Sequence, residues 1–77
     1  MRQLLLHLAR GLVREPGRVR VHEHAEDGRT ILELEVAPLD RGRVIGREGR
    51  TAHALRVLLE ALARRKGEKL ELEILDE

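Results

Sequence analysis

Hydrophobic residues recur at two spacings along the chain, and these spacings predict which segments are helices and which are strands. Residues 1–14 and 50–66 carry them at intervals of three and four, which is the spacing of one helix face. The predicted core positions of the two helices are Leu4, Leu5, Leu8, Ala9, Leu12 and Val13, then Ala54, Leu55, Leu58, Leu59, Ala61 and Leu62. Pro16 with Gly17 follows the first segment and Gly67 follows the second, and both are typical helix stops.

Strict alternation of apolar and polar residues predicts three strands. It covers residues 18–25 and 30–37, and the Asp27-Gly28 pair between them is a strong signal for a tight antiparallel hairpin. A third alternating segment covers residues 69–75, and a short helical turn is expected over residues 42–45. The predicted order is α-β-β-α-α-β, an α+β fold whose three-stranded sheet carries helices on one face. The 77 residues are enough for one hydrophobic core, so we expect a single domain over 1–77.

The alternation also assigns a face to each strand residue. The core face is predicted to carry Val19, Val21, Leu32, Leu34, Val36, Leu70, Leu72 and Ile74. On the face toward water, two glutamates of the second strand can lie across from three residues of the first: Glu33, Glu35, Arg20, His22 and His24. Opposite charges in such positions stabilise a sheet by roughly 0.2–1 kcal/mol per pair.

Composition removes several kinds of site. The chain has no Cys and no Phe, Tyr or Trp, which excludes disulfides, thiolate metal sites and aromatic stacking on bases. Ser is absent, Thr30 and Thr51 have no evident base partner, and the alternating glutamates mark the wet face of a sheet. We therefore expect no enzyme, no catalytic residues and no cofactor.

Two further features predict what the protein lacks. His22 and His24 could form a metal pair on one strand face, but exposed strand histidines are usually ordinary surface residues, so no metal site is expected. The apolar run from Leu4 to Leu6 is too short for a signal peptide or a membrane span. The chain is accordingly expected to be cytoplasmic and to have no membrane partner.

Charge is unevenly distributed, although the formal net charge is only +1. Residues 1–20 and residues 41–56 each contain five Arg and one Glu, whereas six of residues 21–40 are acidic. A clustered basic segment is what a polyanion-binding surface needs, but such a segment is more often a solvated helix face. Charge alone leaves both interpretations open.

The most informative segment joins the short helical turn to the long helix, and it reads Arg43, Val44, Ile45, Gly46, Arg47, Glu48, Gly49 and Arg50. Glycine lets a backbone approach a ligand closely, and the helix that starts beyond the loop directs N–H groups and partial positive charge toward that ligand. Val44 and Ile45 could floor a trough for bases, and His53 lies one turn into the helix beside the loop. The glycine spacing fits neither a Walker A loop nor a dinucleotide fingerprint. Alone, Gly-x-x-Gly is also compatible with a simple corner between helices.

The chain resembles the small single-domain bacterial RNA-binding proteins of the KhpA family, within the type II KH domains. The resemblance runs nearly end to end, and the residues that carry it are Val36-Ala37, Asp40, Gly42 to Gly46, Gly49 to Ala52, Ala54 and Arg56. It implies single-stranded RNA binding, in which a KH loop clamps about four nucleotides by their backbone. On this basis residues 46–49 hold phosphates, and Val44 and Ile45 line the base groove.

The sequence also departs from the family pattern. Arg43 and Arg47 stand where relatives often have Lys, which keeps the charge and adds planar phosphate geometry. Glu48 is acidic, so it either reduces affinity or caps the following helix. The resemblance further implies a role as an RNA chaperone or post-transcriptional regulator. The alternative is a protein-interaction adaptor that forms a homodimer, or a heterodimer with a second KH-domain protein, with Leu4 and Leu6 as candidate contacts.

Overall fold

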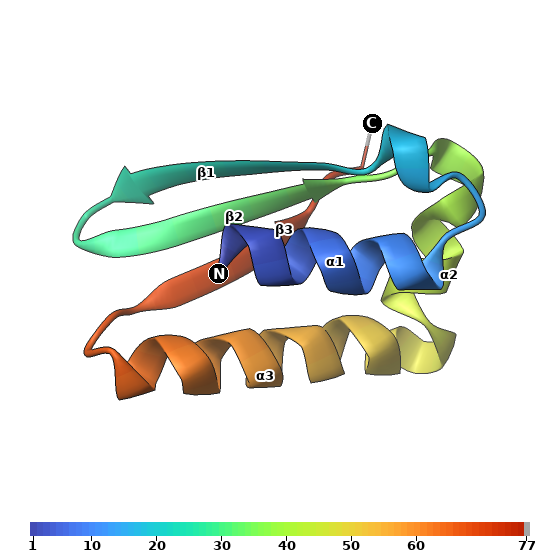
Figure 1. Ribbon diagram of the computed structural model, residues 1–77. Helices are drawn as coiled ribbons and strands as arrows, with labels where there is room; N and C mark the ends of the chain where they lie inside the picture. The colour runs from blue at the N-terminus through green and yellow to red at the C-terminus, as the bar shows by residue number, and fades with distance from the viewer. Residues whose placement is uncertain (77) are drawn as a thin grey trace.

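The computed structural model describes residues 1–76 and contains a three-stranded sheet with its helices on one face (Figure 1). The elements are α1 Arg2–Leu12, β1 Arg20–Glu26, β2 Arg29–Glu35, α2 Arg41–Ile45, α3 Arg50–Arg65 and β3 Leu70–Ile74. Short 3₁₀ turns lie at Pro16–Arg18, Pro38–Asp40 and Arg47–Gly49. The predicted order α-β-β-α-α-β is therefore confirmed.

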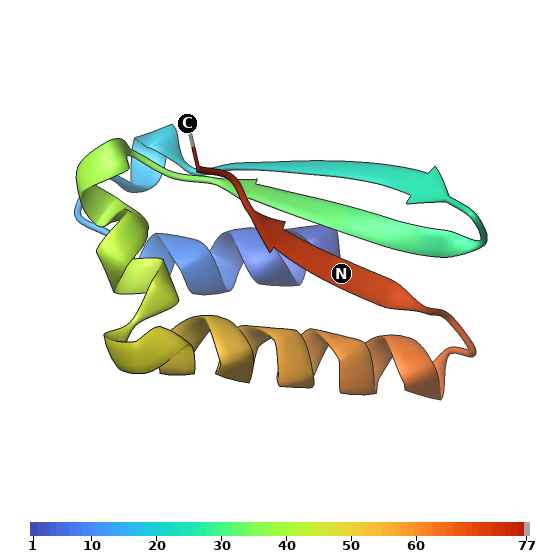
Figure 2. The ribbon, with the colours of Figure 1, turned by 180° about the vertical axis from the view of Figure 1, so that it is seen from behind.

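The sheet has the order β1-β2-β3 and is mixed. β1 and β2 form the predicted antiparallel hairpin, with Arg20 opposite Glu35 and Glu26 opposite Arg29, while β2 and β3 run parallel. Asp27 and Gly28 both have positive φ, 51° and 76°, which is the conformation a two-residue hairpin turn requires. α1 passes in front of the sheet in Figure 1 and behind β3 when the molecule is seen from the other side (Figure 2).

The core lies between the sheet and the two long helices, and its α3 side differs from the prediction. The fully or nearly buried residues of α3 are Ala52, Leu55, Leu59 and Ala63. Leu58, predicted to be core, is 43% exposed, and Leu62 is only half-buried. The small alanines let α3 approach its neighbours closely, so the helix is rotated about its axis and presents Leu58 toward solvent. In α1, Leu5 and Ala9 are buried as predicted, whereas Leu12 is exposed.

The open face of the sheet confirms part of the expected cross-strand pairing. His22 Nε2 lies 3.1 Å from Glu35 Oε1, and Arg29 Nη1 lies 3.1 Å from Glu71 Oε1 on the next strand. Arg20 is different, because its Nη1 donates to the carbonyls of Gly17 and Val19 at 2.8 and 3.0 Å. Arg20 lies opposite Glu35 as expected, but among residues 1–76 it forms no ion pair.

One buried carboxylate connects the end of α1 to the start of α2. Asp40 is only 2% exposed, and its Oδ1 and Oδ2 each accept a backbone N–H, from Arg14 and Glu15, at 3.1 Å. Arg43 Nη1 lies 3.4 Å from the same Oδ1. The carboxylate thus satisfies two N–H groups of the chain that leaves α1, and the nearby guanidinium offsets its charge.

Replacing Asp40 by Ala is expected to lower the free energy of unfolding by about 2–4 kcal/mol, because two backbone N–H groups lose a charged acceptor. Urea denaturation followed by circular dichroism would measure this. Asp76→Ala is the control, since Asp76 is exposed and pairs with Arg41 at only 3.4 Å; it should cost no more than about 0.5 kcal/mol. Equal effects of the two substitutions would contradict the structural role of Asp40.

Candidate nucleic-acid interface

The loop between α2 and α3 is a closed turn fixed by backbone hydrogen bonds. Gly46 N–H donates to Gly42 O at 2.9 Å and ends α2. Gly49 N–H then donates to Gly46 O at 3.1 Å, and Arg50 N–H donates to Arg47 O, which leads directly into α3. The loop therefore has one defined shape, located at the end of the molecule opposite the β1–β2 hairpin tip (Figure 1).

Gly46 occupies a position that only glycine can fill. Its φ of 79° and ψ of 172° lie in a region essentially restricted to glycine. A Cβ at Gly46 would also collide with the Thr51 hydroxyl and lie 2.8 Å from the Thr51 backbone nitrogen. The end of α2 and the first turn of α3 therefore touch at this point, and the absent side chain sets their distance.

The other loop residues also have unusual backbone angles. Gly49 has φ 75° and ψ 12°, and Glu48 has φ 57° and ψ 25°, so both are left-handed. For Glu48, a residue with a side chain, this conformation costs roughly 1 kcal/mol. The carboxylate of Glu48 lies 3.8 Å from Arg50 Nη2 and does not bond to the start of α3, because no side chain among residues 1–76 caps that helix. The helix-capping interpretation of Glu48 is therefore wrong.

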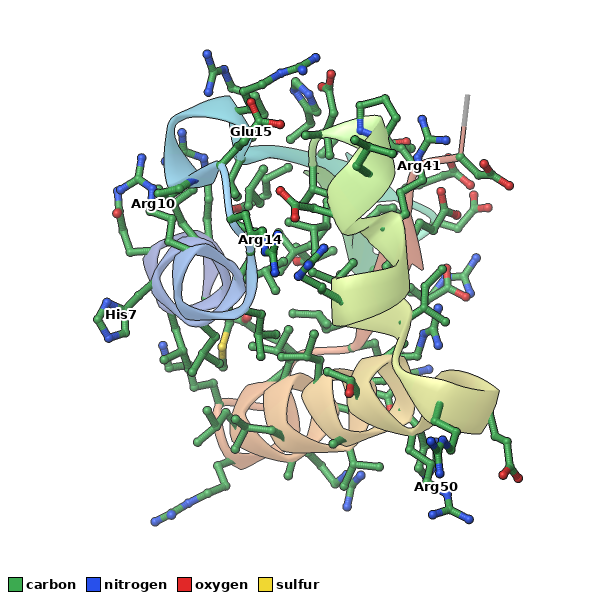
Figure 3. All side chains as sticks on the ribbon, turned by 90° about the vertical axis from the view of Figure 1, so that its right-hand side faces the viewer. His7, Arg10, Arg14, Glu15, Arg41 and Arg50 are labelled. Carbon is green, nitrogen blue, oxygen red and sulfur yellow. The ribbon has the colours of Figure 1, made fainter. Side chains whose placement is uncertain are left out.

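The five arginines of residues 41–56 divide into three that are bound to the protein and two that project into solvent. Arg41 pairs with Asp76 at 3.4 Å, Arg43 donates to Leu39 O and approaches Asp40, and Arg56 Nε donates to Leu72 O at 3.2 Å. Arg47 is exposed and forms no ion pair with the described residues. Arg50 is also exposed, and its pair with Glu48 is a solvent-screened contact (Figure 3).

The remaining predicted site residues differ in exposure. Val44 is completely buried in the core, so it cannot line a groove for bases, and this part of the prediction is wrong. Consecutive side chains of a helix point in different directions around its axis, so Ile45, the next residue, is 40% exposed beside the loop. His53 is exposed in the first turns of α3. The exposed members of the site are thus Ile45, Arg47, Glu48, Arg50 and His53.

This arrangement suits an anion. α3 is 16 residues long, and its N-terminus carries partial positive charge next to the guanidinium groups of Arg47 and Arg50. No acidic residue lies in the first turn of α3. A phosphate at the loop would therefore meet glycine backbone, a helix N-terminus and two arginine side chains.

The site depends on two residues that the sequence singles out only as part of the family resemblance, without a role. Asp40 holds the start of α2 in place, and Thr51 sets the space at Gly46. Neither has a signal in the pattern of apolar residues, because a buried carboxylate and a close backbone contact depend on tertiary structure. An acidic residue at the end of a Pro-containing turn, as in Pro38-Leu39-Asp40, is a local hint for Asp40.

Comparison with known proteins covers nearly the whole chain. A family model described as the KH domain of KhpA and KhpB matches residues 2–74. The chain belongs to the KhpA/KhpB KH-domain family. The Halalkalibacterium halodurans protein named RNA-binding protein KhpA is 46% identical over 77 residues, which is 99% of this chain and 100% of the relative.

Other KhpA relatives are equally complete. The RNA-binding protein KhpA of Treponema pallidum is 46% identical over 74 residues, covering 96% of this chain and 92% of the relative. That of Leifsonia xyli is 44% identical over 73 residues, covering 95% and 93%. No solved structure matches the chain significantly. Within residues 1–76 no helix is long and apolar enough to span a membrane.

The two loop glycines of this KH domain should differ in their tolerance of substitution. Gly49→Ala is expected to cost about 1–2 kcal/mol, the penalty of a left-handed residue. Gly46→Ala should cost clearly more, because the added Cβ also strikes Thr51. Urea denaturation of both variants, with Gly49→Asn as a milder substitution, would measure the order, and equal losses at the two positions would contradict it.

Proposed function

We propose that this protein binds single-stranded RNA, with the loop of residues 46–49 and the start of α3 holding the phosphate backbone. The observation that carries the proposal is the defined loop, in which Gly46 leaves the backbone open beside Arg47, Arg50 and the N-terminus of α3. The names of the relatives, RNA-binding protein KhpA, support the same class of ligand.

Phosphate contacts would supply most of the affinity. Arg47 is free to donate two parallel hydrogen bonds to a phosphate, and Arg50 can exchange its weak contact with Glu48 for another. Glu48 lies in the same loop and opposes an approaching anion, so it reduces affinity. Because arginine contacts dominate, binding should weaken as salt concentration rises.

Base contacts would be few. Ile45 offers one exposed apolar side chain beside the loop, and His53 offers a ring that can donate or accept a hydrogen bond. The chain has no aromatic residue on which a base could stack, and such stacking is worth roughly 1–3 kcal/mol per base where it occurs. We therefore infer a weak binder of low sequence preference, which fits a cytoplasmic, non-enzymatic RNA chaperone or post-transcriptional regulator.

Arg47→Gln combined with Arg50→Gln should weaken binding of a short single-stranded RNA, measured by fluorescence anisotropy at several salt concentrations. The log–log salt slope should become shallower by about 1.4, since each phosphate contact to a single strand contributes about 0.7. The matched control is Arg64→Gln with Lys69→Gln, which removes the same charge at and just beyond the far end of α3. Equal losses in the two double variants would contradict binding at the loop.

A second activity, self-association, is favoured by two apolar pockets between α1 and α3, together called the apolar groove below. One part, of about 220 Å³, is lined by Leu8, Leu12, Ala54 and Leu58 among others, and a second part, of about 420 Å³, is lined by Met1, Leu4 and Leu62 with two basic residues. Exposed apolar surface of this kind marks protein contacts. We propose that a second copy of the chain covers it, which would join two RNA loops and raise the effective affinity for one RNA.

Leu12→Glu with Leu58→Glu should abolish this association, measured by sedimentation velocity over a range of concentrations, because two charges would be buried in the contact. Leu39→Glu is the control, since Leu39 is 88% exposed and lies outside the groove. A native protein that stays monomeric at every concentration would contradict self-association. A heterodimer with another KH-domain protein would then be the remaining form of the adaptor hypothesis.

A further inference from the structure

The arginines of the first basic segment have no ionic partners, which the function proposed for the loop does not explain. Residues 1–20 contain Arg2, Arg10, Arg14, Arg18 and Arg20, and none of them lies within 4.0 Å of a carboxylate among the described residues. By contrast, three of the five arginines in residues 41–56 are ion-paired. The larger group of uncompensated charge is therefore outside the loop.

Three of these arginines line one groove between α1 and β1. The groove has a volume of about 380 Å³. It is lined by Arg2, Leu6 and Arg10 from α1, by Val19, and by Arg20, Val21 and His22 from β1. β1 is an edge strand, so the groove is open along one side of the sheet. A concave surface lined by several cationic side chains suits the backbone of a nucleic acid strand.

Two of the guanidinium groups are held in position by the protein. Arg2 Nε donates to Val21 O at 3.3 Å, and Arg20 Nη1 donates to Gly17 O and Val19 O. These bonds engage only part of each guanidinium, and the remaining N–H groups are available to a ligand. A side chain that is already positioned loses less conformational entropy when it binds a phosphate.

The sequence of α1 is unfavourable for a helix that has no anionic ligand. α1 contains no acidic residue, and Arg2 stands in its first turn, where the partial charge of the helix is already positive. Among the described residues, one carboxylate forms an ion pair with a residue of this groove: Glu35 Oε1 lies 3.1 Å from His22 Nε2. A basic residue at the positive end of a helix that has no acidic residue departs from the usual charge pattern, and such departures are typical of functional surfaces.

We propose that the α1/β1 groove, formed by Arg2, Arg10, Arg20 and His22, is a second binding surface for the phosphate backbone of single-stranded RNA. Arg10 and Arg50 project from opposite sides of the molecule, so the groove and the loop cannot hold the same four nucleotides (Figure 3). The groove engages either a distant part of a long strand or a second strand. The inference deepens the proposed function and rests on RNA being the ligand of the loop.

The test compares two unstructured RNAs of different length. One is an oligouridylate of about four nucleotides, which the loop alone can cover, and the other is an oligouridylate several times longer. The variant is Arg2→Gln, Arg10→Gln and Arg20→Gln, and the control is Arg29→Gln, Arg64→Gln and Lys69→Gln, which removes the same charge outside the loop and both grooves. Because Arg2 and Arg20 bond to the backbone, Arg10→Gln alone, which disturbs no recorded hydrogen bond, provides a second variant. Circular dichroism checks that each one folds.

For the long RNA, the triple variant should bind roughly 10-fold to 100-fold more weakly at low salt, and its log–log salt slope should be shallower by about 2. Arg10→Gln should show about one third of that change in slope. Affinity for the short RNA should stay within about twofold of native. A long-RNA slope equal to that of the control would overturn the proposal.

The outcomes also separate this inference from the proposed function. If Arg47→Gln with Arg50→Gln leaves short-RNA binding unchanged, the loop proposal fails whatever the groove does. If the loop variant loses the short RNA while the groove variant binds the long RNA like the control, only the second surface is rejected.

Discussion

The carboxylate of Asp40 holds together the part of the fold on which the loop depends. It joins the chain leaving α1 to the start of α2 by accepting two backbone N–H groups, in a site from which water is almost excluded. α2 has only five residues, too few to be stable as an isolated helix. Its position is therefore set from outside, by Asp40 at its start and by the buried side chain of Val44 near its end.

The position of α2 then decides the shape of the loop. Gly46 ends α2 in a conformation restricted to glycine. Because Gly46 has no side chain, Thr51 in the first turn of α3 can occupy the space beside it. The next three residues have little freedom, since two of them are left-handed and the hydrogen bonds of the turn are closed. Backbone strain at Glu48 is acceptable because both helices that flank the loop are fixed by the core.

The sequence pattern predicted the order of the elements, the hairpin turn at Asp27-Gly28 and the place of the loop, because these depend on local chemistry. It did not predict the rotation of α3, in which Ala52 and Ala63 are buried and Leu58 is exposed. Periodicity shows which side of a helix is apolar, but close packing in the core decides which residues on that side are buried, and here small residues are among them. Likewise, Val44 and Ile45 are both apolar, and only the fold shows that Val44 belongs to the core and Ile45 to the surface.

The fold also distinguishes charged residues that the sequence does not. Two segments each contain five arginines and one glutamate, and the sequence makes them look equivalent. In the structure most of those in residues 41–56 are bound to protein groups, so the loop presents chiefly Arg47 and Arg50. The arginines of residues 1–20 donate only to backbone carbonyls where they bond at all, and a carbonyl leaves the full positive charge uncompensated. A protein of net charge +1 therefore exposes arginines on two sides, because half of its 14 acidic residues lie on the β1–β2 hairpin and on β3.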